Sequence, residues 1–319
     1  MNPETRQKIK ELFPLVKEDV PLAPLTTFGL GGKATFYLRV KTAGRLAGVL
    51  ALVRAYHLPA TIMAGGSNIV FADERVDKLI IHYQSFNHAR PTILGRKMRV
   101  EAGLVLDKVV KISARAGMAG LEYLTDIPGT VGGAIVGNAG AYGQAIADHL
   151  VKIEYFDGLM VKTMPAAEAE FAYRHSIFKT KDWAVLAGVF RLPAGDPAEL
   201  MRVVARIRRF RRKKYEPGLK CPGSFFKNVL VETVSSEVLG RLDQSKIIDG
   251  KIPAGYLLEA VGALGRRRGD IAIASFHGNL LFNLGEGTCR DVSGLAAELK
   301  QAVWDKFGIT LEEEIRYIF

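Results

Sequence analysis

Clustered glycines are the feature of this 319-residue sequence that most directly suggests chemistry. Six of them fall within residues 129–143, in a run that continues from Ile127-Pro128-Gly129-Thr130-Val131-Gly132-Gly133-Ala134 to Asn138-Ala139-Gly140-Ala141-Tyr142-Gly143. Closely spaced glycines let backbone N–H groups approach an anion such as a pyrophosphate, although a single glycine more often serves a turn or close packing. The run matches neither the G-x-G-x-x-G fingerprint nor the Walker pattern, which excludes an ordinary Rossmann or P-loop site.

A second glycine turn, Ala64-Gly65-Gly66-Ser67-Asn68, follows a short apolar stretch. Its hydroxyl and amide side chains are able to bind a phosphate or the edge of a ring. Serine and asparagine also stabilise turns by hydrogen bonding to their own backbone, so this turn alone indicates little.

A third turn, Pro222-Gly223-Ser224-Phe225-Phe226-Lys227-Asn228, places a hydroxyl before two aromatic residues and a cation. A serine nucleophile needs a histidine base and an acid that orients the base. The six histidines offer no G-x-S-x-G context and no recognisable partner. Ser224 is therefore a candidate proton donor, with a plain turn as the alternative.

Three charged segments accompany these turns. Arg174 lies in the polar and aromatic stretch Tyr173–Lys179, and Glu314 ends a row of three glutamates near the C-terminus; such residues are more often solvated surface. A basic helix predicted at 197–215 is either a solvated face or a nucleic-acid contact. Its Arg211 and Lys214 are three residues apart and share one face, so they are able to hold a diphosphate just before the Ser224 turn.

Composition indicates a soluble, intracellular, globular protein. Apolar residues make up 48% and charged residues 24%, and the net charge of +11 favours anionic partners. Two cysteines, Cys221 and Cys289, are too few for a disulfide framework or a zinc site, so we expect free thiols and no bound metal. The N-terminal residues lack the apolar core of a signal peptide, and the stretch 47–64 is broken by charged residues and a proline, so no membrane insertion is expected.

The order of predicted elements indicates an α/β fold. Helices are expected over residues 5–18, 43–56, 106–116, 197–215, 254–261 and 293–307. Strands are expected over 35–40, 61–63, 150–156, 160–164, 184–192 and 279–283, and within 79–102 between turns at Pro91 and Gly95. The basic helix marks a boundary before the C-terminal third.

Taken in order, these segments resemble the UDP-N-acetylenolpyruvoylglucosamine reductase family. The resemblance spans nearly the whole chain, through Thr27-Phe28-Gly29-Leu30-Gly31-Gly32, the 65–68 turn, the 127–143 run, Tyr173-Arg174-x-Ser176-x-Phe178, the 223–228 turn and the Leu311–Ile315 tail. It implies an α/β (α+β) fold of the vanillyl-alcohol-oxidase type, with FAD-binding subdomains at 1–75 and 76–208. A substrate domain would follow at 209–319, with its last residues returning to the active site.

The resemblance also implies an activity. Family members reduce the enolpyruvyl group of UDP-N-acetylglucosamine enolpyruvate to UDP-N-acetylmuramate in peptidoglycan precursor synthesis, with FAD as cofactor and NADPH as co-substrate. The glycine motifs contain no obvious histidine or cysteine anchor, so the FAD is expected to be non-covalent. The implied partners are small molecules in the cytoplasm, with no nucleic acid and no obligate protein partner.

Residue roles follow from the resemblance at matching positions. Ser224 would give a proton to the carbanionic carbon after hydride addition, and Arg174 and Glu314 would stabilise the enolate-like charge. The substrate carboxylate or UDP would be held by Arg211, Lys214, Lys227 and Asn228. The expected FAD-binding residues are Gly65, Gly66, Ser67, Asn68, Pro128, Gly129, Thr130, Gly132, Gly133, Ala134, Asn138, Gly140, Tyr142 and Gly143.

The sequence departs from the family pattern at three places and is shorter than some members. Ala64 replaces the first of three glycines, Val229 replaces a proline, and Gly278 replaces an alanine between His277 and Asn279. The spacing of 50 residues between Arg174 and Ser224 leaves no room for a substrate-capping loop, which indicates the shorter subtype. Two alternatives stay open: another FAD oxidoreductase of this fold acting on an alcohol or hydroxy acid, and a basic nucleic-acid-binding protein.

Overall fold

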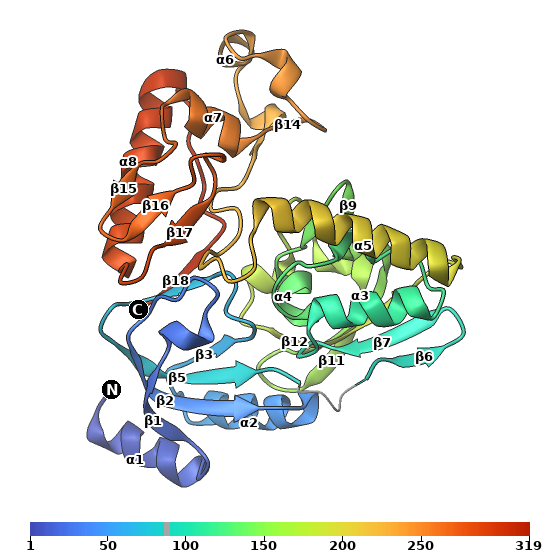
Figure 1. The fold of residues 1–319 in the computed structure, drawn as a ribbon. Coiled ribbons are helices and arrows are strands. Elements are labelled where there is room, and N and C mark those ends of the chain that lie inside the picture. Colours follow the sequence, from blue (N-terminus) through green and yellow to red (C-terminus); the bar gives the residue numbers. More distant parts are fainter. Residues whose placement is uncertain (86–89) are drawn as a thin grey trace. The chain divides into compact units, whose positions relative to one another are not determined.

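The computed structural model describes residues 1–85 and 90–319, which form two compact units (Figure 1). Unit 1 comprises Met1–Val20, Ala34–Gly65 and Asp77–Glu216. Unit 2 comprises Pro21–Lys33, Gly66–Val76 and Pro217–Phe319. Each unit joins segments that are distant in the sequence, and each has its own apolar core. The division at residues 75 and 208 expected from the sequence stays a prediction.

The N-terminal part of unit 1 contains a four-stranded sheet. Its strand order is β1 (Lys17–Pro21), β2 (Lys33–Val40), β5 (Arg75–Tyr83) and β3 (Ala60–Met63), and β3 runs parallel to β5. Helix α2 (Ala43–Ala55) connects β2 to β3 and buries Leu46 and Val49. The predicted strand, helix, strand and glycine turn are therefore present, and β3 leads directly into the Ala64–Asn68 turn.

Helix α1 (Pro3–Leu12) is shorter than the helix expected at 5–18. The residue before a proline is disfavoured in the helical conformation, and proline itself has no N–H to donate. Pro14 therefore ends the helix, with Phe13 as its C-cap, and β1 begins at Lys17. The prediction for residues 13–18 was wrong because apolar periodicity outweighed this proline.

A five-stranded antiparallel sheet forms the centre of the second part of unit 1. Its order is β11 (Val161–Pro165), β10 (Leu150–Phe156), β12 (Ala184–Arg191), β7 (Lys97–Glu101) and β6 (Thr92–Leu94). Helix α4 (Val131–Val136) packs against β12, while α3 (Leu106–Arg115) packs against the basic helix α5 (Pro197–Lys214) (Figure 1). These elements confirm the predicted helices and strands between residues 106 and 215. Part of the strand pattern expected at 79–102 falls on residues 86–89, which lie outside the described residues.

Short elements connect the larger ones in unit 1. They are η2 (Glu122–Leu124), β8 (Gly140–Ala141), β9 (Gln144–Ala145), η3 (Ile146–His149), η4 (Ala166–Ala169) and η5 (Ile177–Lys179). The hairpin of β8 and β9 contains the last part of the glycine run.

Unit 2 packs helices α7 (Ala254–Ala260) and α8 (Cys289–Phe307) with a small sheet of β15 (Arg267–Arg268), β16 (Ile271–Ile273) and β17 (Leu281–Asn283). The chain ends in β18 (Arg316–Ile318), which pairs in parallel with β4 (Ile69–Phe71). Smaller elements are η1 (Ala23–Leu25), β13 (Val229–Leu230), η6 (Val231–Thr233), α6 (Ser236–Gly240), η7 (Gln244–Lys246) and β14 (Lys251–Ile252).

Helix α8 starts four residues before the predicted position 293. Thr288 caps it, and its side chain accepts the N–H of Asp291 at 3.0 Å while the Asp291 carboxylate accepts the N–H of Thr288 at 3.1 Å. This capping box satisfies two backbone donors that no helical carbonyl can reach. The Asp73 carboxylate also accepts the N–H groups of Cys289 and Arg290, which fixes the start of the helix in the core of unit 2.

Both cysteines are free, as predicted, and the structure shows that both are buried. Burial raises the pKa of the Cys289 thiol to about 11, and the neighbouring Asp73 carboxylate adds to this effect. Among the described residues, no helix is long and apolar enough to cross a membrane. Nor do those residues contain a group of histidine, cysteine, aspartate and glutamate side chains suited to a metal ion.

Candidate functional site

Within unit 1, Gly65, the first glycine of the second predicted turn, touches Gly129 of the 127–143 run. A β-carbon added at Gly65 would lie 2.8 Å from the Cα of Gly129 and 3.5 Å from its N and C atoms. Carbon atoms do not approach this closely without displacement, so the two backbones pack in direct contact only because residue 65 is glycine. Gly65 and the start of the 127–143 run are therefore in direct backbone contact within unit 1.

Three backbone hydrogen bonds attach the start of the glycine run to the segment between β7 and α3. The N–H of Gly132 donates to Ala102 O at 2.8 Å, and the N–H of Val131 donates to Leu104 O at 2.9 Å. The carbonyl of Gly129 accepts the N–H of Leu106 at 3.1 Å. The amides of Val131 and Gly132 are therefore already paired, as are those of Ala134, Gly137, Asn138 and Ala139 within the run itself, so an anion would be bound by other amides.

Gly132 and Gly133 are adjacent but have different surroundings. A β-carbon at Gly132 would lie 2.7 Å from the Ala102 β-carbon, so close packing alone requires a glycine there. Gly133 is exposed, and the nearest atom to a β-carbon there is Thr130 Oγ1 at 3.8 Å. No packing within the described residues explains the glycine at 133, and it leaves space at the surface of the run for a bound group.

Arg174 lies against the second half of the glycine run. Its Nη1 donates to Gly140 O at 3.3 Å, and Lys179 Nζ donates to the Arg174 carbonyl at 2.7 Å. Asn138 Nδ2 donates to Ala172 O at 2.9 Å, and Ser176 Oγ donates to Val136 O at 2.8 Å. Unit 1 therefore brings the predicted catalytic arginine to the predicted cofactor segment across more than thirty residues of sequence.

Two buried polar atoms in and next to the 127–143 run suggest a bound group. The side-chain oxygens of Asn138 and Gln144 are buried and have no hydrogen-bond partner among the described residues. Buried carbonyl oxygens are nearly always satisfied, so each unpaired acceptor calls for a donor from water or a ligand. A cofactor rich in hydroxyl and N–H groups fits these acceptors and the open surface at Gly133.

Unit 2 brings Ser224, Asn68 and Glu314 into one neighbourhood. The N–H of Glu314 donates to Phe225 O at 2.8 Å, next to Ser224 in the chain. Asn68 Nδ2 donates to Glu314 O at 2.9 Å, and the N–H of Arg316 donates back to Asn68 O at 3.0 Å. The C-terminal tail therefore lies between the Ser67–Asn68 turn and the Ser224 turn.

The two other predicted substrate residues of unit 2 are engaged within it. Lys227 Nζ pairs with Glu312, and the Lys227 N–H donates to Glu312 O at 2.8 Å. Asn228 Oδ1 accepts the N–H of Ala254 at 3.2 Å, at the start of α7. These contacts hold the side chains of Lys227 and Asn228, which follow Ser224 by three and four residues in the sequence.

Asn279 is a positioning residue that the sequence analysis missed. Its Oδ1 accepts the N–H of Phe226 and its Nδ2 donates to Phe226 O, both at 2.8 Å. Its backbone carbonyl accepts the N–H of Phe225 at 3.2 Å. Asn279 is 3% exposed. Its buried amide forms two hydrogen bonds to the backbone of Phe226, as a neighbouring strand would. In the sequence, Asn279 stood out only as part of a motif departure.

Comparison with known proteins identifies the family. Residues 34–159 match the model of an FAD binding domain, and residues 215–318 match the C-terminal domain of UDP-N-acetylenolpyruvoylglucosamine reductase. The reductase of Solibacter usitatus is 38% identical over 306 residues, which cover 95% of this chain and 96% of that protein. The chain belongs to the UDP-N-acetylenolpyruvoylglucosamine reductase family.

Further relatives agree with this assignment. The reductase of a Synechococcus strain is 32% identical and covers 95% of this chain and 91% of its own. The crystal structure of the reductase from Thermus caldophilus aligns with a TM-score of 0.72 at 30% identity, covering 95% of this chain and 99% of that one. The expected fold class and the FAD cofactor are thereby confirmed.

The two family models divide the predicted site residues of this reductase-family chain. The FAD binding model spans every predicted cofactor residue from Gly65 to Gly143, and the C-terminal model spans Ser224, Lys227, Asn228 and Glu314. Three predicted residues lie outside both models: Arg174, Arg211 and Lys214. The individual roles of all these side chains stay predictions.

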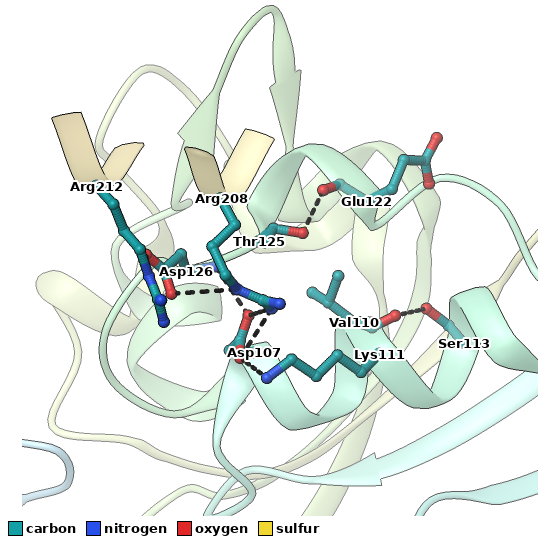
Figure 2. A network of polar contacts seen from close by, with 9 residues as sticks. All are labelled: Asp107, Val110, Lys111, Ser113, Glu122, Thr125, Asp126, Arg208 and Arg212. Atoms are coloured by element: carbon teal, nitrogen blue, oxygen red, sulfur yellow. Dashed lines mark hydrogen bonds and ion pairs between the residues drawn. The ribbon is translucent and has the colours of Figure 1, made fainter. Parts of the chain in front are cut away.

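Helix α5 presents fewer unpaired cations than its sequence suggests. Arg208 pairs with Asp107 at 3.1 Å and with Asp126 at 3.7 Å, and Arg212 pairs with Asp126 at 3.7 Å (Figure 2). Arg211 and Lys214 both lie over the ring of Tyr215, at 5.3 and 5.2 Å from its centroid. The arginines at 208 and 212 thus have partners within the reductase-family fold, which weakens the nucleic-acid interpretation of this helix.

Proposed function

We propose that this protein is an NADPH-dependent flavoenzyme that reduces UDP-N-acetylglucosamine enolpyruvate to UDP-N-acetylmuramate. The observation that supports this function most directly is 38% identity, over 95% of the chain, to a protein named UDP-N-acetylenolpyruvoylglucosamine reductase. In unit 2, backbone hydrogen bonds join the chain segments that carry Ser224 and Glu314, the proposed proton donor and its proposed acidic partner. The cytoplasm, which holds NADPH and nucleotide sugars, is the proposed location.

The chemistry that FAD supplies when bound is hydride transfer from NADPH to the enolpyruvyl double bond. The side chains of the protein handle the proton and the developing charge. Ser224 Oγ is proposed to donate the proton that completes the reduced carbon, which a neutral hydroxyl is able to do without a prior base. Arg174 and Glu314 are proposed to stabilise the enolate-like charge that precedes protonation.

The substrate is proposed to be held through its anionic groups. Lys227 and Asn228 follow Ser224 directly, which suits contacts to the carboxylate or the sugar nucleotide. Arg211 and Lys214 lie over one aromatic ring on α5, so their cationic ends are directed to the same region. Charge-assisted hydrogen bonds from two neighbouring cations suit a diphosphate.

The proposed function is tested with the purified protein. We expect a yellow protein with a flavin absorption spectrum, and NADPH oxidation that depends on UDP-N-acetylglucosamine enolpyruvate and yields UDP-N-acetylmuramate. Flavin reduced or turned over by an alcohol or hydroxy acid, with no activity on the enolpyruvyl compound, would support the alternative oxidoreductase. A colourless protein with salt-dependent nucleic-acid affinity would support the binding module instead.

Replacing Asn279 by aspartate should lower the stability of the protein and slow the proposed proton transfer from Ser224 to the substrate. The change removes the donor to Phe226 O and places a negative charge where the side chain is 3% exposed. An unsatisfied buried polar group costs about 1 to 3 kcal/mol, so the melting temperature should fall by several degrees. Because Asn279 holds the Ser224 turn, enolpyruvyl reduction should slow while FAD reduction by NADPH is unchanged, as followed by stopped-flow absorbance.

Asn283→Asp is the matched control for this prediction. Asn283 is 5% exposed, and its Nδ2 donates to Phe28 O and Gly29 O at 3.3 Å each, so the same substitution disturbs a different turn of unit 2. We expect a comparable loss of stability with normal substrate reduction. Equal substrate kinetics in the two variants would reduce Asn279 to a structural role.

A further inference from the structure

Asp126 occupies an unusual place at the start of the glycine run. It directly precedes Ile127-Pro128-Gly129, and its φ of +62° lies in the left-handed region, where residues with a β-carbon are disfavoured by about 1 to 2 kcal/mol. Aspartate tolerates this conformation better than most residues, but it needs local hydrogen bonds to do so. The contacts of Asp126 therefore help to fix the backbone conformation at the start of the 127–143 run.

Both ends of the 126–129 loop are attached to the first turn of α3. The N–H of Asp126 donates to Asp107 Oδ1 at 2.9 Å. The carbonyl of Gly129 accepts the N–H of Leu106 at 3.1 Å. Two adjacent residues of α3 thus hold a four-residue loop at its beginning and its end, and Gly129 is the residue whose backbone packs on Gly65.

Arginines of helix α5 form ion pairs with the carboxylates of Asp107 and Asp126 (Figure 2). Arg208 Nη2 lies 3.1 Å from Asp107 Oδ1, and its Nε lies 3.7 Å from Asp126 Oδ1. Lys111 Nζ pairs with Asp107 at 2.6 Å, and Arg212 Nε lies 3.7 Å from Asp126. Arg208 therefore bridges the anchor on α3 and the loop residue itself.

The ion-pair network at Asp107, Asp126 and Arg208 is partly sheltered from solvent. The side chains of Asp107, Asp126 and Arg208 are only 21–26% exposed, so solvent screens their attraction less than at an open surface. Burial alone raises the pKa of Asp107, but hydrogen bonds from Lys111 and from the Asp126 backbone outweigh it and lower that pKa. These hydrogen bonds therefore favour the charged form of the Asp107 side chain.

We propose that Asp107, Arg208 and Asp126 are positioning residues for FAD, because they hold the 126–129 loop in its binding conformation before the cofactor arrives. The proposal rests on the assignment of the 127–143 run to FAD. A loop that is ordered in the apoprotein loses less conformational entropy on binding, so the network raises affinity without touching the ligand. Removing it should loosen the loop and weaken FAD binding while the remaining fold persists.

The test compares Arg208→Gln with Arg202→Gln in FAD-free protein. Both arginines are on α5, but the ion pair of Arg202 is with exposed Glu199 one turn away, at side-chain exposures of 70% and 64%. FAD is titrated by quenching of its fluorescence, and hydrogen exchange is followed in peptides covering residues 120–133. For Arg208→Gln we expect Kd for FAD to rise about tenfold and exchange in these peptides to accelerate. Arg202→Gln should behave as the parent protein.

Asp126→Asn provides a second, independent variant. Asparagine tolerates the left-handed conformation but lacks the charge that pairs with Arg208 and Arg212, so the same two changes are expected if Arg208→Gln does not fold. Parent-like FAD affinity in the variants, with a lower melting temperature alone, would overturn the proposal and leave only an ion pair that joins α3 to α5. A parent protein that binds FAD but fails on the enolpyruvyl substrate would instead contradict the proposed function and leave this inference intact.

Discussion

Replacing Ser224 by alanine is expected to abolish enolpyruvyl reduction while FAD stays bound and is still reduced by NADPH. Positioned proton donors contribute about 10²- to 10⁴-fold, so the rate at which reduced enzyme turns over substrate should fall by about a thousandfold. FAD reduction requires no proton from Ser224 in the proposed mechanism. Stopped-flow absorbance separates the two half-reactions, since the first bleaches the flavin and the second restores its colour.

The structure supports a folded Ser224→Ala protein. Ser224 is half-buried, and the backbone of the following residues fixes the turn through Asn279 and Glu314. The substitution removes one oxygen and leaves those bonds in place. Slow flavin reduction together with normal substrate reduction in this variant would contradict the proton-donor assignment, and restored turnover in Ser224→Cys would support it, because a thiol also carries a transferable proton.

Local sequence patterns predicted the longer helices and strands, but they missed the short helices α4 and α6 and several short strands, among them β4, β16 and β18. Among the helices that were predicted, the errors lie at the ends. Apolar periodicity placed residues 13–18 in α1 although Pro14 prevents it, and it began α8 at Ser293 instead of Cys289. Both boundaries were readable from local chemistry, since a proline ends the first helix and the Thr288-x-x-Asp291 capping box starts the second. Periodicity reports the buried face of a helix and says little about where the helix stops.

The sequence also indicated the candidate site, but not the residues that support it. Glycine runs and turn serines are visible one segment at a time, and their order along the chain carries the family resemblance. Asn279 forms hydrogen bonds to Phe226, which is 53 residues away in the sequence, and Arg208 pairs with Asp107, which is 101 residues away. Contacts at such separations depend on how helices and strands pack, so a single sequence without its fold gives no sign of them.

The difference between Gly132 and Gly133 is a further example. The two glycines are indistinguishable in the sequence, and both were expected to contact FAD. The structure gives Gly132 a packing reason, because Ala102 lies against it, and gives Gly133 none among the described residues. A substitution at position 133 is therefore the cleaner test of whether the run binds a cofactor.

Replacing Gly133 by valine is expected to remove FAD from an otherwise folded protein. A β-carbon there meets nothing closer than Thr130 Oγ1 at 3.8 Å, and valine is intrinsically somewhat better than glycine inside a helix such as α4. The fold should therefore persist, whereas the branched side chain fills the exposed surface proposed for FAD. We expect a colourless protein with a native circular-dichroism spectrum, a cooperative melt and at least a hundredfold weaker FAD binding by fluorescence titration, roughly the effect of losing two close polar contacts.

Two further variants show whether the effect belongs to the site. Gly44→Val makes the same change at an exposed glycine of α2 in the same unit, where no atom lies within 4 Å of the new β-carbon, and it should stay yellow. Gly132→Val forces the valine against Ala102, so its cofactor loss should come with a lower melting temperature of the apoprotein. If Gly133→Val retained FAD at parental affinity, the surface above residue 133 would not be where the cofactor binds. FAD contacts would then have to be sought at the Gly65–Gly129 junction and around Asn138, where the unpaired side-chain oxygen is an acceptor independent of any glycine.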